Sequence, residues 1–211
     1  MELRDAILRR RTYTKYLEKK VDPKLITDIL NVAIHAPSSG NMQNWNIVLV
    51  DVDDKKKQIA QACLEQMWML QAPMYIIILN KKPDMKRMFG VKANMFGIQN
   101  CAALAQNILL LATEKGLASC WVGSFDKDAV SRAVNAPPTQ EPQIIITLGY
   151  SNENPRSTRV PLDKVCCFNE CGNRMKGYEL FPLQKHMSSI KKDSKGLLDK
   201  VKNIFKKKNS K

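Results

Sequence analysis

The chain has 211 residues, 44% of them hydrophobic and 26% charged, which excludes a disordered or fibrous protein and fits one globular domain with a buried core. The formal net charge is +14, but the segment 185–211 alone holds ten lysines against two aspartates. A surface for nucleic acid would have to lie in this tail, and we expect no nucleic-acid partner.

The N-terminal sequence MELRDAILRRR is charged and lacks the apolar core of a secretory signal. No run of about 18 apolar residues predicts a membrane span. We therefore expect a cytoplasmic protein with reduced thiols. Cys166, Cys167 and Cys171 match no common zinc or iron–sulfur spacing, so no metal site is predicted.

Hydrophobic periodicity and turn residues predict alternating helices and strands. The expected helices lie at residues 2–10, 22–36, 54–70, 98–115 and 126–134. The expected strands lie at residues 46–51, 74–80, 119–122 and 143–150. Residues 81–96 have no clean period and are predicted to form a mobile loop or lid with short helical turns. This alternation indicates a layered fold of sheet and helices.

Two of these elements are apolar on every side. The segment MYIIILN at 74–80 is a continuous apolar run of strand length, which predicts a strand buried on both faces. The helix at 98–115 is apolar nearly all round, so it must be buried on several sides. It lies either in the middle of the core or between two subunits.

A polar turn separates the second helix from the first strand. Pro37 to Asn44 contains two serines, two asparagines, a glutamine and a glycine, and Trp45 follows. Hydroxyl, amide and backbone N–H groups on one turn form a directional cradle for a heterocycle with donors and acceptors on one edge. An elaborate capping loop is an equally good interpretation of the composition.

Arginines and hydroxyl groups lie together at both ends of the globular region. Arg10 and Arg11 precede Thr12, and Arg156 and Arg159 flank a serine and a threonine. Guanidinium forks beside hydroxyls suit a phosphate, although a solvated basic face is the usual role of such runs. Motifs for nucleotide loops, metalloproteases and serine hydrolases are missing, so a bound cofactor is expected to carry any chemistry.

Five motifs occur in a fixed order along the chain. They are Arg10-Arg11-Thr12-Tyr13-Thr14-Lys15-Tyr16; Ala36-Pro37-Ser38-Ser39-Gly40-Asn41-Met42-Gln43-Asn44-Trp45; Gln66-Met67-Trp68 with Ala72-Pro73; the apolar segment from Ala102 to Gly123; and Gly149-Tyr150 with Glu153, Pro155, Arg159 and Pro161. In this order and spacing, residues 3–172 resemble the FMN-dependent nitroreductase family.

The resemblance implies an α+β fold, a three-layer α/β/α sandwich with a mixed, mainly antiparallel sheet, in an intertwined homodimer. Residues 1–176 would form the FMN-binding domain and residues 177–211 a basic extension. Each FMN site would lie at the subunit interface and be lined by both chains.

The residues assigned to FMN by this resemblance are Arg10, Arg11, Thr12, Thr14, Pro37, Ser38, Ser39, Asn41, Gln43, Gln66, Gly123, Ser124, Arg156 and Arg159. The polar turn would contact the flavin from one subunit. Arg10, Thr12 and Arg159 would bind its phosphate. Gly123 and Ser124 would bring backbone N–H groups near the reactive N5 atom. No catalytic side chain is predicted.

The implied function is that of an FMN-dependent oxidoreductase, which passes electrons from NAD(P)H to a small oxidised acceptor such as a nitroaromatic or a quinone by a ping-pong mechanism. One alternative is a flavin carrier or sensor with little turnover. A specialised activity of the superfamily, such as reductive dehalogenation, is another.

Two positions depart from the family pattern. Thr14 stands where a basic residue is expected, with Lys15 beside it, and Asn44 replaces the usual proline. A cation near the pyrimidine end of the flavin would stabilise its reduced anion. If Lys15 does not reach that place, the flavin should have a lower reduction potential than in a typical member.

The tail contains a second kind of signal. In residues 195–211, five apolar residues at helical spacing share one face and lysines fill the others. A basic amphipathic helix predicts weak contact of residues 195–208 with a membrane surface, which would make the protein peripheral to the membrane. The alternative is a helix that packs on the other subunit.

Overall fold

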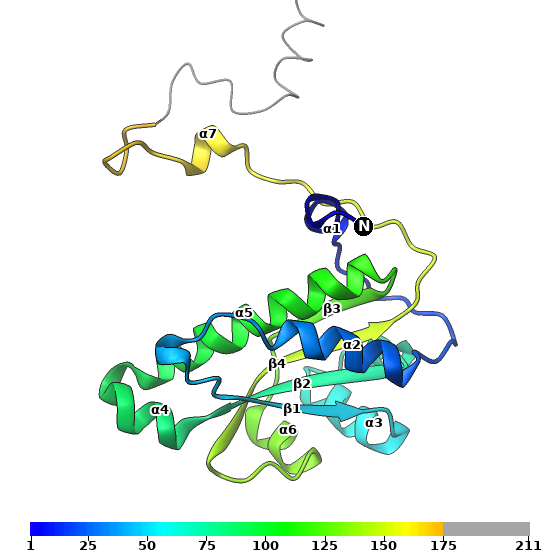
Figure 1. Cartoon of the computed structure of the whole chain (residues 1–211). Coiled ribbons are helices and arrows are strands. Elements are labelled where there is room, and N and C mark those ends of the chain that lie inside the picture. The colour runs from blue at the N-terminus through cyan, green and yellow to red at the C-terminus, as the bar shows by residue number, and fades with distance from the viewer. Residues whose placement is uncertain (175–211) are drawn as a thin grey trace, which may run out of the picture. The chain divides into compact units, whose positions relative to one another are not determined.

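The structure is a computed structural model that describes residues 1–174 (Figure 1). Its elements are α1 (Leu3–Arg9), α2 (Pro23–Ala33), the 3-10 turn η1 (Ser39–Asn41), β1 (Trp45–Val50), α3 (Asp53–Ala62), η2 (Met67–Gln71), β2 (Met74–Lys81), α4 (Lys82–Phe89), η3 (Gly90–Lys92), α5 (Ala93–Glu114), β3 (Ala118–Val122), α6 (Lys127–Ala133), β4 (Gln140–Gly149) and α7 (Leu162–Val165). Residues Met1–Ser157 form one compact unit, and a second unit begins at Thr158.

The described strands form one sheet in the order β1-β2-β4-β3. Every neighbouring pair is antiparallel. The register between β2 and β4 shifts once, between Ile78 and Leu79. The four predicted strands are therefore present, each within a few residues of its expected bounds, and the α+β class is confirmed.

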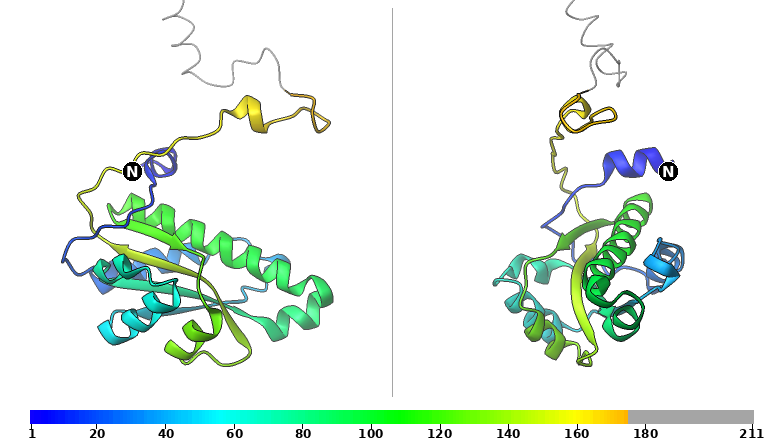
Figure 2. Two further views of the ribbon diagram at one scale, coloured as in Figure 1. Left: turned by 180° about the vertical axis from the view of Figure 1, so that it is seen from behind. Right: turned by 90° about the vertical axis from the view of Figure 1, so that its left-hand side faces the viewer.

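Strand β2 is buried on both faces, as its apolar run predicts. Ile76 and Ile78 point into one core, where they meet residues of α2 and α5. Tyr75 and Ile77 point into a second core against α3 and α6. The right-hand view of Figure 2 shows these helix pairs on opposite sides of the sheet. The predicted three-layer sandwich is confirmed.

The position of α5 in the core accounts for the apolar side chains on most of its faces. Cys101, Leu104 and Ile108 belong to the first core and are fully buried. By length and composition alone, the helical stretch Lys82–Glu114 could also cross a membrane. A buried core helix has the same length and composition, and here Cys101, Leu104 and Ile108 pack on the sheet.

The helix predicted at 54–70 is wrong in its second half. Helix α3 ends at Ala62, and Leu64 and Glu65 both have positive φ, 56° and 57°. Two residues in the left-handed region reverse the chain direction at a cost in backbone strain. The reversal lets η2 tuck Met69 into the second core before β2 begins.

The loop conformation predicted at 81–96 is also wrong, because most of this segment is helical. Helix α4 has Pro83 in its first turn, where proline is well tolerated, and is capped at its C-terminal end by Gly90, whose φ is 52°. Met85 is its one buried residue. The rings of Phe89 and Phe96 pack edge to face with centroids 5.1 Å apart, which joins α4 to the first turn of α5.

The second unit is described through residue 174. It contains α7 and a short antiparallel bridge between Cys167 and Arg174. All six cysteines are thiols, and burial raises the pKa of Cys101 to about 12. No cluster of potential metal ligands occurs within residues 1–174. The predicted extension at 177–211, with its amphipathic helix, lies outside the described residues.

Candidate functional site

None of the sequence-predicted site residues is buried, and they fall into several separate groups. The first group is the polar turn. Gly40, Asn41 and Gln43 all have positive φ, at 59°, 55° and 46°. The backbone N–H of Gln43 donates to Ser38 Oγ (3.0 Å). Gln43 Nε2 donates to the backbone oxygen of Asn41 (3.2 Å). Asn41 and Gln43 therefore brace the turn.

A buried row of asparagines lies beneath this turn. Both the backbone N–H and the hydroxyl of Ser39 donate to Asn100 Oδ1, at 3.0 and 3.2 Å. Asn100 Nδ2 donates to Asn44 Oδ1 (2.6 Å), and Asn44 Nδ2 donates to Asn80 Oδ1 (2.7 Å). All three asparagines are at most 4% exposed. We call Asn44, Asn80 and Asn100 the asparagine row.

Sequence reasoning missed Asn80 and Asn100 as site residues. A signal existed, because each interrupts an apolar element, β2 and α5 respectively. A buried amide is rare unless its hydrogen bonds are satisfied, so an asparagine inside an apolar run calls for a partner. The departure at Asn44 now has an explanation, since its amide connects the other two.

The second group is an N-terminal arm, residues 10–17, which follows α1. Its backbone is held by the sheet: Tyr13 N donates to Ser119 O (3.2 Å) and Leu17 N donates to Tyr150 O (2.8 Å). Tyr16 N donates to Gln71 Oε1 (3.3 Å), a contact that the sequence did not reveal. The arm is thus fixed at the start of β3, where the chain leaves α5.

Tyr16 anchors this arm in the second core. Its hydroxyl donates to Tyr13 O (3.0 Å) and lies 2.6 Å from Thr147 Oγ1. Burial raises the pKa of the Tyr16 phenol far above its ordinary value. The phenol is therefore neutral at physiological pH and serves as a structural hydrogen-bonding group.

The two arginines of the arm, Arg10 and Arg11, differ in the hydrogen bonds of their guanidinium groups. Arg11 Nη1 donates to the backbone oxygens of Leu8 and Arg10, at 2.6 and 2.8 Å, and so closes the end of α1. The guanidinium of Arg10 makes no hydrogen bond or ion pair within residues 1–174. Thr12 and Thr14 are exposed. Of this cluster, Arg10 and Thr12 are available to a ligand.

Lys15, the neighbour of Thr14, is engaged with an acidic side chain of its own subunit. Its Nζ lies 3.7 Å from Glu153 Oε1 in an ion pair. Of the other predicted phosphate contacts, Arg156 is exposed on the first unit. Arg159 belongs to the second unit, where its Nη1 donates to Thr158 O (2.9 Å).

The predicted N5 contacts, Gly123 and Ser124, lie in the exposed loop after β3. This loop is tied to the end of α3, because Asp126 N donates to Ala62 O (2.9 Å). Gln66 lies beyond the strained turn that follows α3, and its Oε1 accepts from Trp68 Nε1 (3.2 Å). A side chain at Gly123 would pack against the Trp121 indole.

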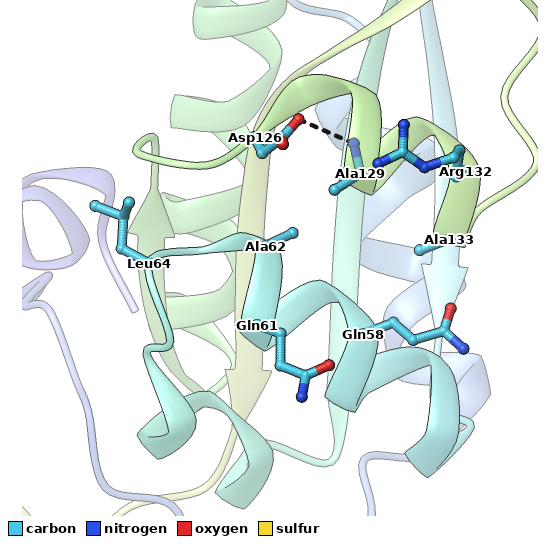
Figure 3. A pocket seen from close by; sticks show the side chains of 8 residues that line it. All are labelled: Gln58, Gln61, Ala62, Leu64, Asp126, Ala129, Arg132 and Ala133. Carbon is cyan, nitrogen blue, oxygen red and sulfur yellow. Dashed lines mark hydrogen bonds between the residues drawn. The ribbon is translucent and has the colours of Figure 1, made fainter.

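An open hollow of about 590 Å³ with mixed polar and apolar lining lies beside this loop, between α3 and α6 (Figure 3). Its lining residues are Gln58, Gln61, Ala62, Leu64, Asp126, Ala129, Arg132 and Ala133. Asp126 Oδ1 accepts from the backbone N–H of Ala129 (3.0 Å) as the cap of α6. None of the predicted flavin residues lines this hollow.

A charged cluster ties α4 and α6 to the start of β4. The Glu141 carboxylate pairs with both Lys82 and Lys127, and it also accepts from Gln143 Nε2 (3.0 Å). Burial raises the pKa of Glu141, but the hydrogen bonds from the two lysines outweigh burial and lower it to about 2. This carboxylate is ionised at neutral pH and holds the two helices in place.

The polar turn and the N-terminal arm lie at opposite ends of α5. The turn contacts Asn100, whereas the arm contacts Ser119, beyond the end of the helix at Glu114. A helix rises about 1.5 Å per residue, so the helical part of that separation is roughly 20 Å. Figure 1 shows both segments at the two ends of α5. Within one chain the two groups cannot contact the same small part of a ligand.

The chain resembles known proteins along most of its length. The sequence model described as "Nitroreductase family" matches residues 7–150. A protein of Methanothermobacter thermautotrophicus, provisionally named NADH dehydrogenase/NAD(P)H nitroreductase, is 29% identical over 159 residues, covering 74% of this chain and 80% of the relative.

Two solved structures share the fold. The NADPH:FMN oxidoreductase of Vibrio harveyi, complexed with NAD+, has a TM-score of 0.73 at 20% identity and covers 88% of this chain and 82% of its own. The FMN-dependent nitroreductase of Clostridium difficile has a TM-score of 0.68 at 24% identity and covers 78% of this chain and 98% of its own. The family match, the relative and the shared fold agree, and the chain belongs to the Nitroreductase family of oxidoreductase enzymes.

Proposed function

We propose that this protein is a homodimeric FMN-dependent oxidoreductase that takes electrons from NAD(P)H and delivers them to a small oxidised acceptor, such as a nitroaromatic or a quinone, in a ping-pong sequence. Support comes from the family match and from the names of its relatives, which include an NAD(P)H nitroreductase and an NADPH:FMN oxidoreductase. One observation carries the proposal: the polar turn and the N-terminal arm lie at the two ends of α5, and each has polar groups without a partner in the described part of the chain.

The residues fit a flavin mononucleotide on chemical grounds. The ring edge of a flavin needs hydrogen-bonding partners, and the Ser38 hydroxyl hydrogen has no acceptor within residues 1–174. The phosphate needs a cation with free donors, and the Arg10 guanidinium meets that need beside the Thr12 hydroxyl. A bound flavin would supply the acceptance of a hydride and its release to a second substrate.

The chain's own residues would bind and position the cofactor. Ser38 and Ser39 would hold the ring edge, and Arg10 and Thr12 would hold the phosphate. Gly123 lies in an open loop with no side chain of its own, so its backbone can approach a flat ring closely.

Two copies of the chain are needed for one complete site in this proposal. The polar turn of one subunit would meet the N-terminal arm of its partner, because one subunit holds these groups at opposite ends of α5. Several apolar residues are exposed beside α5 and could be covered by a second copy: Leu3, Ile7 and Leu8 of α1, Val32 of α2 and Ile98 of α5. A twofold arrangement would complete two equal sites.

The first experiment is to purify the protein, record its absorption spectrum, release any chromophore by heat and identify it. FMN at one per subunit supports the proposal, and a protein that stays colourless after incubation with FMN contradicts it. Steady-state oxidation of NAD(P)H with a quinone or a nitroaromatic then separates an oxidoreductase from a flavin carrier, which would bind FMN but turn over poorly.

Mixed dimers test the two-copy site. Arg10→Ala and Ser38→Ala should each weaken FMN binding, since each removes one half of every site. When the two variants are unfolded, mixed and refolded, each heterodimer should regain one intact site and one doubly altered site. If the mixture binds no more FMN than the separate variants, the site is not shared between subunits. The matched control is Arg87→Ala, an exposed arginine of α4 that is not assigned to the site.

A further inference from the structure

We infer that the asparagine row sets the hydrogen-bond polarity of the polar turn, so that Ser39 accepts and Ser38 donates toward a bound ligand. The turn would then select a ligand edge that presents an N–H group next to a carbonyl oxygen. Asn44, Asn80 and Asn100 would be positioning residues, since they act through Ser39. This inference rests on the proposed function, in which that edge belongs to the flavin ring.

The orientation of each amide follows from one backbone group. The N–H of Ser39 can only donate, so the atom of Asn100 that lies 3.0 Å away must be Oδ1. Asn100 Nδ2 then faces Asn44 and requires an acceptor, which fixes Asn44 Oδ1 there (2.6 Å). By the same logic, Asn44 Nδ2 faces Asn80 Oδ1 (2.7 Å).

The row ends on a donor without a partner. Asn80 Nδ2 is buried and makes no hydrogen bond within the described part of the chain. The Asn80 amide lies close to α5 at Gly97, where an added Cβ atom would stand only 2.7 Å from Asn80 Oδ1. Reversing all three amides would give Asn80 Nδ2 an acceptor in Asn44 Oδ1, but it would place the Asn100 NH2 group against the Ser39 N–H. The backbone group therefore decides the direction.

This direction makes one serine hydroxyl an acceptor and the other a donor toward a ligand. The Ser39 hydroxyl lies 3.2 Å from Asn100 Oδ1, and the hydrogen between two oxygens can come only from the serine. Its lone pairs are left to accept from a ligand. Ser38 Oγ already accepts from Gln43 N (3.0 Å), which leaves its hydrogen to donate. A neighbouring donor and acceptor match an N–H beside a C=O.

The test compares two probes, FMN and FMN methylated at its ring N3, in titrations of the apoprotein followed by flavin fluorescence. The wild-type chain should bind FMN roughly tenfold or more tightly than the methylated probe, because the Ser39 acceptor loses its donor. Asn100→Leu should release the Ser39 hydroxyl and bring the ratio of the two dissociation constants down toward that of Ser39→Ala.

Asn100→Asp is the conservative variant. An aspartate keeps the acceptor for Ser39, and the amides of Asn44 and Asn80 can both turn over, which gives the unpartnered Asn80 donor an acceptor. The ratio should therefore stay near the wild-type value. A role in folding alone would predict equal ratios in Asn100→Leu and Asn100→Asp, and thermal unfolding of each variant checks that it is folded.

The outcomes separate this inference from the proposed function. Tight FMN binding with a ratio that Asn100→Leu leaves unchanged would overturn the inference alone, because the methyl group would then be excluded by shape. A wild-type chain that binds neither probe would overturn the proposed function and the inference with it. A ratio that falls in Asn100→Leu and persists in Asn100→Asp supports both.

Discussion

Replacing Gly97 with alanine should destabilise the protein, although alanine is the better helix former. Gly97 lies inside α5 and is buried against the asparagine row. An added Cβ would stand 2.7 Å from Asn80 Oδ1 and 2.8 Å from Asn80 Cγ, with the amide nitrogen closer still. Real Cβ atoms essentially never come this close, so the Asn80 side chain would have to move.

The magnitude follows from three contributions. Alanine gains about 1 kcal/mol over glycine in a helix interior. Overpacking of a full site costs about 1–3 kcal/mol. Displacement of Asn80 also leaves the buried Asn44 Nδ2 without its acceptor, which costs about 1–3 kcal/mol. The net destabilisation is about 1–5 kcal/mol, with a central value near ~3 kcal/mol.

The sign of the effect should reverse when Asn80 is removed. Asn80→Ala alone is destabilising, but in that background Gly97→Ala meets no side chain and should stabilise the protein by about 1 kcal/mol. Urea unfolding of the four proteins forms a double-mutant cycle. If Gly97→Ala stabilises the otherwise unaltered protein, the close packing of Asn80 on α5 is refuted.

Three further predictions concern residues away from this row. Tyr16→Phe should cost about 1–3 kcal/mol of unfolding free energy in urea, because the Thr147 hydroxyl loses its buried partner; an unchanged midpoint would contradict this role. Asp22→Ala should cost about 1 kcal/mol in the same assay, since the Asp22 side chain accepts from Lys24 N (2.8 Å) at the start of α2, and Asp22→Asn should retain most of it. The pKa of Glu141 is lowered from its ordinary 4.5 to about 2 in the folded protein. The ionised carboxylate therefore stabilises the fold above about pH 4.5, and this stabilisation is lost as the pH falls toward 2. The wild-type chain should lose more stability between about pH 5 and about pH 3 than Glu141→Gln, and equal losses would refute the assignment.

Much of the fold could be predicted because the strongest signals were local. The apolar run of β2 and the cap of α2 by Asp22 and Pro23 each have one reasonable interpretation. Errors came where backbone conformation or tertiary contact decided the outcome. The left-handed residues Leu64 and Glu65 have no special sequence signature, so the break after α3 could not be foreseen.

The site was predicted as a set of residues but not as an arrangement. The motif order identified the polar turn and the arm, yet the position of one relative to the other depends on the length and placement of α5. The partners Asn100 of Ser39 and Gln71 of Tyr16 lie 61 and 55 residues away in the sequence. A single sequence carries no information on such distant pairs until the fold brings them together.

The strand order has a consequence for synthesis on the ribosome. Strands β2 and β3 are separated in the sheet by β4, which is the last of the four to be made. Until residues 140–149 have emerged, β2 has a neighbour on one side only and β3 has none, so both present open edges to other nascent chains. The arrival of β4 pairs with β2 and β3 in one step and completes the layer on which α2, α5, α3 and α6 pack. Chains that end before this strand should therefore aggregate, and a holdase chaperone would be needed longest during the synthesis of α5 to α6.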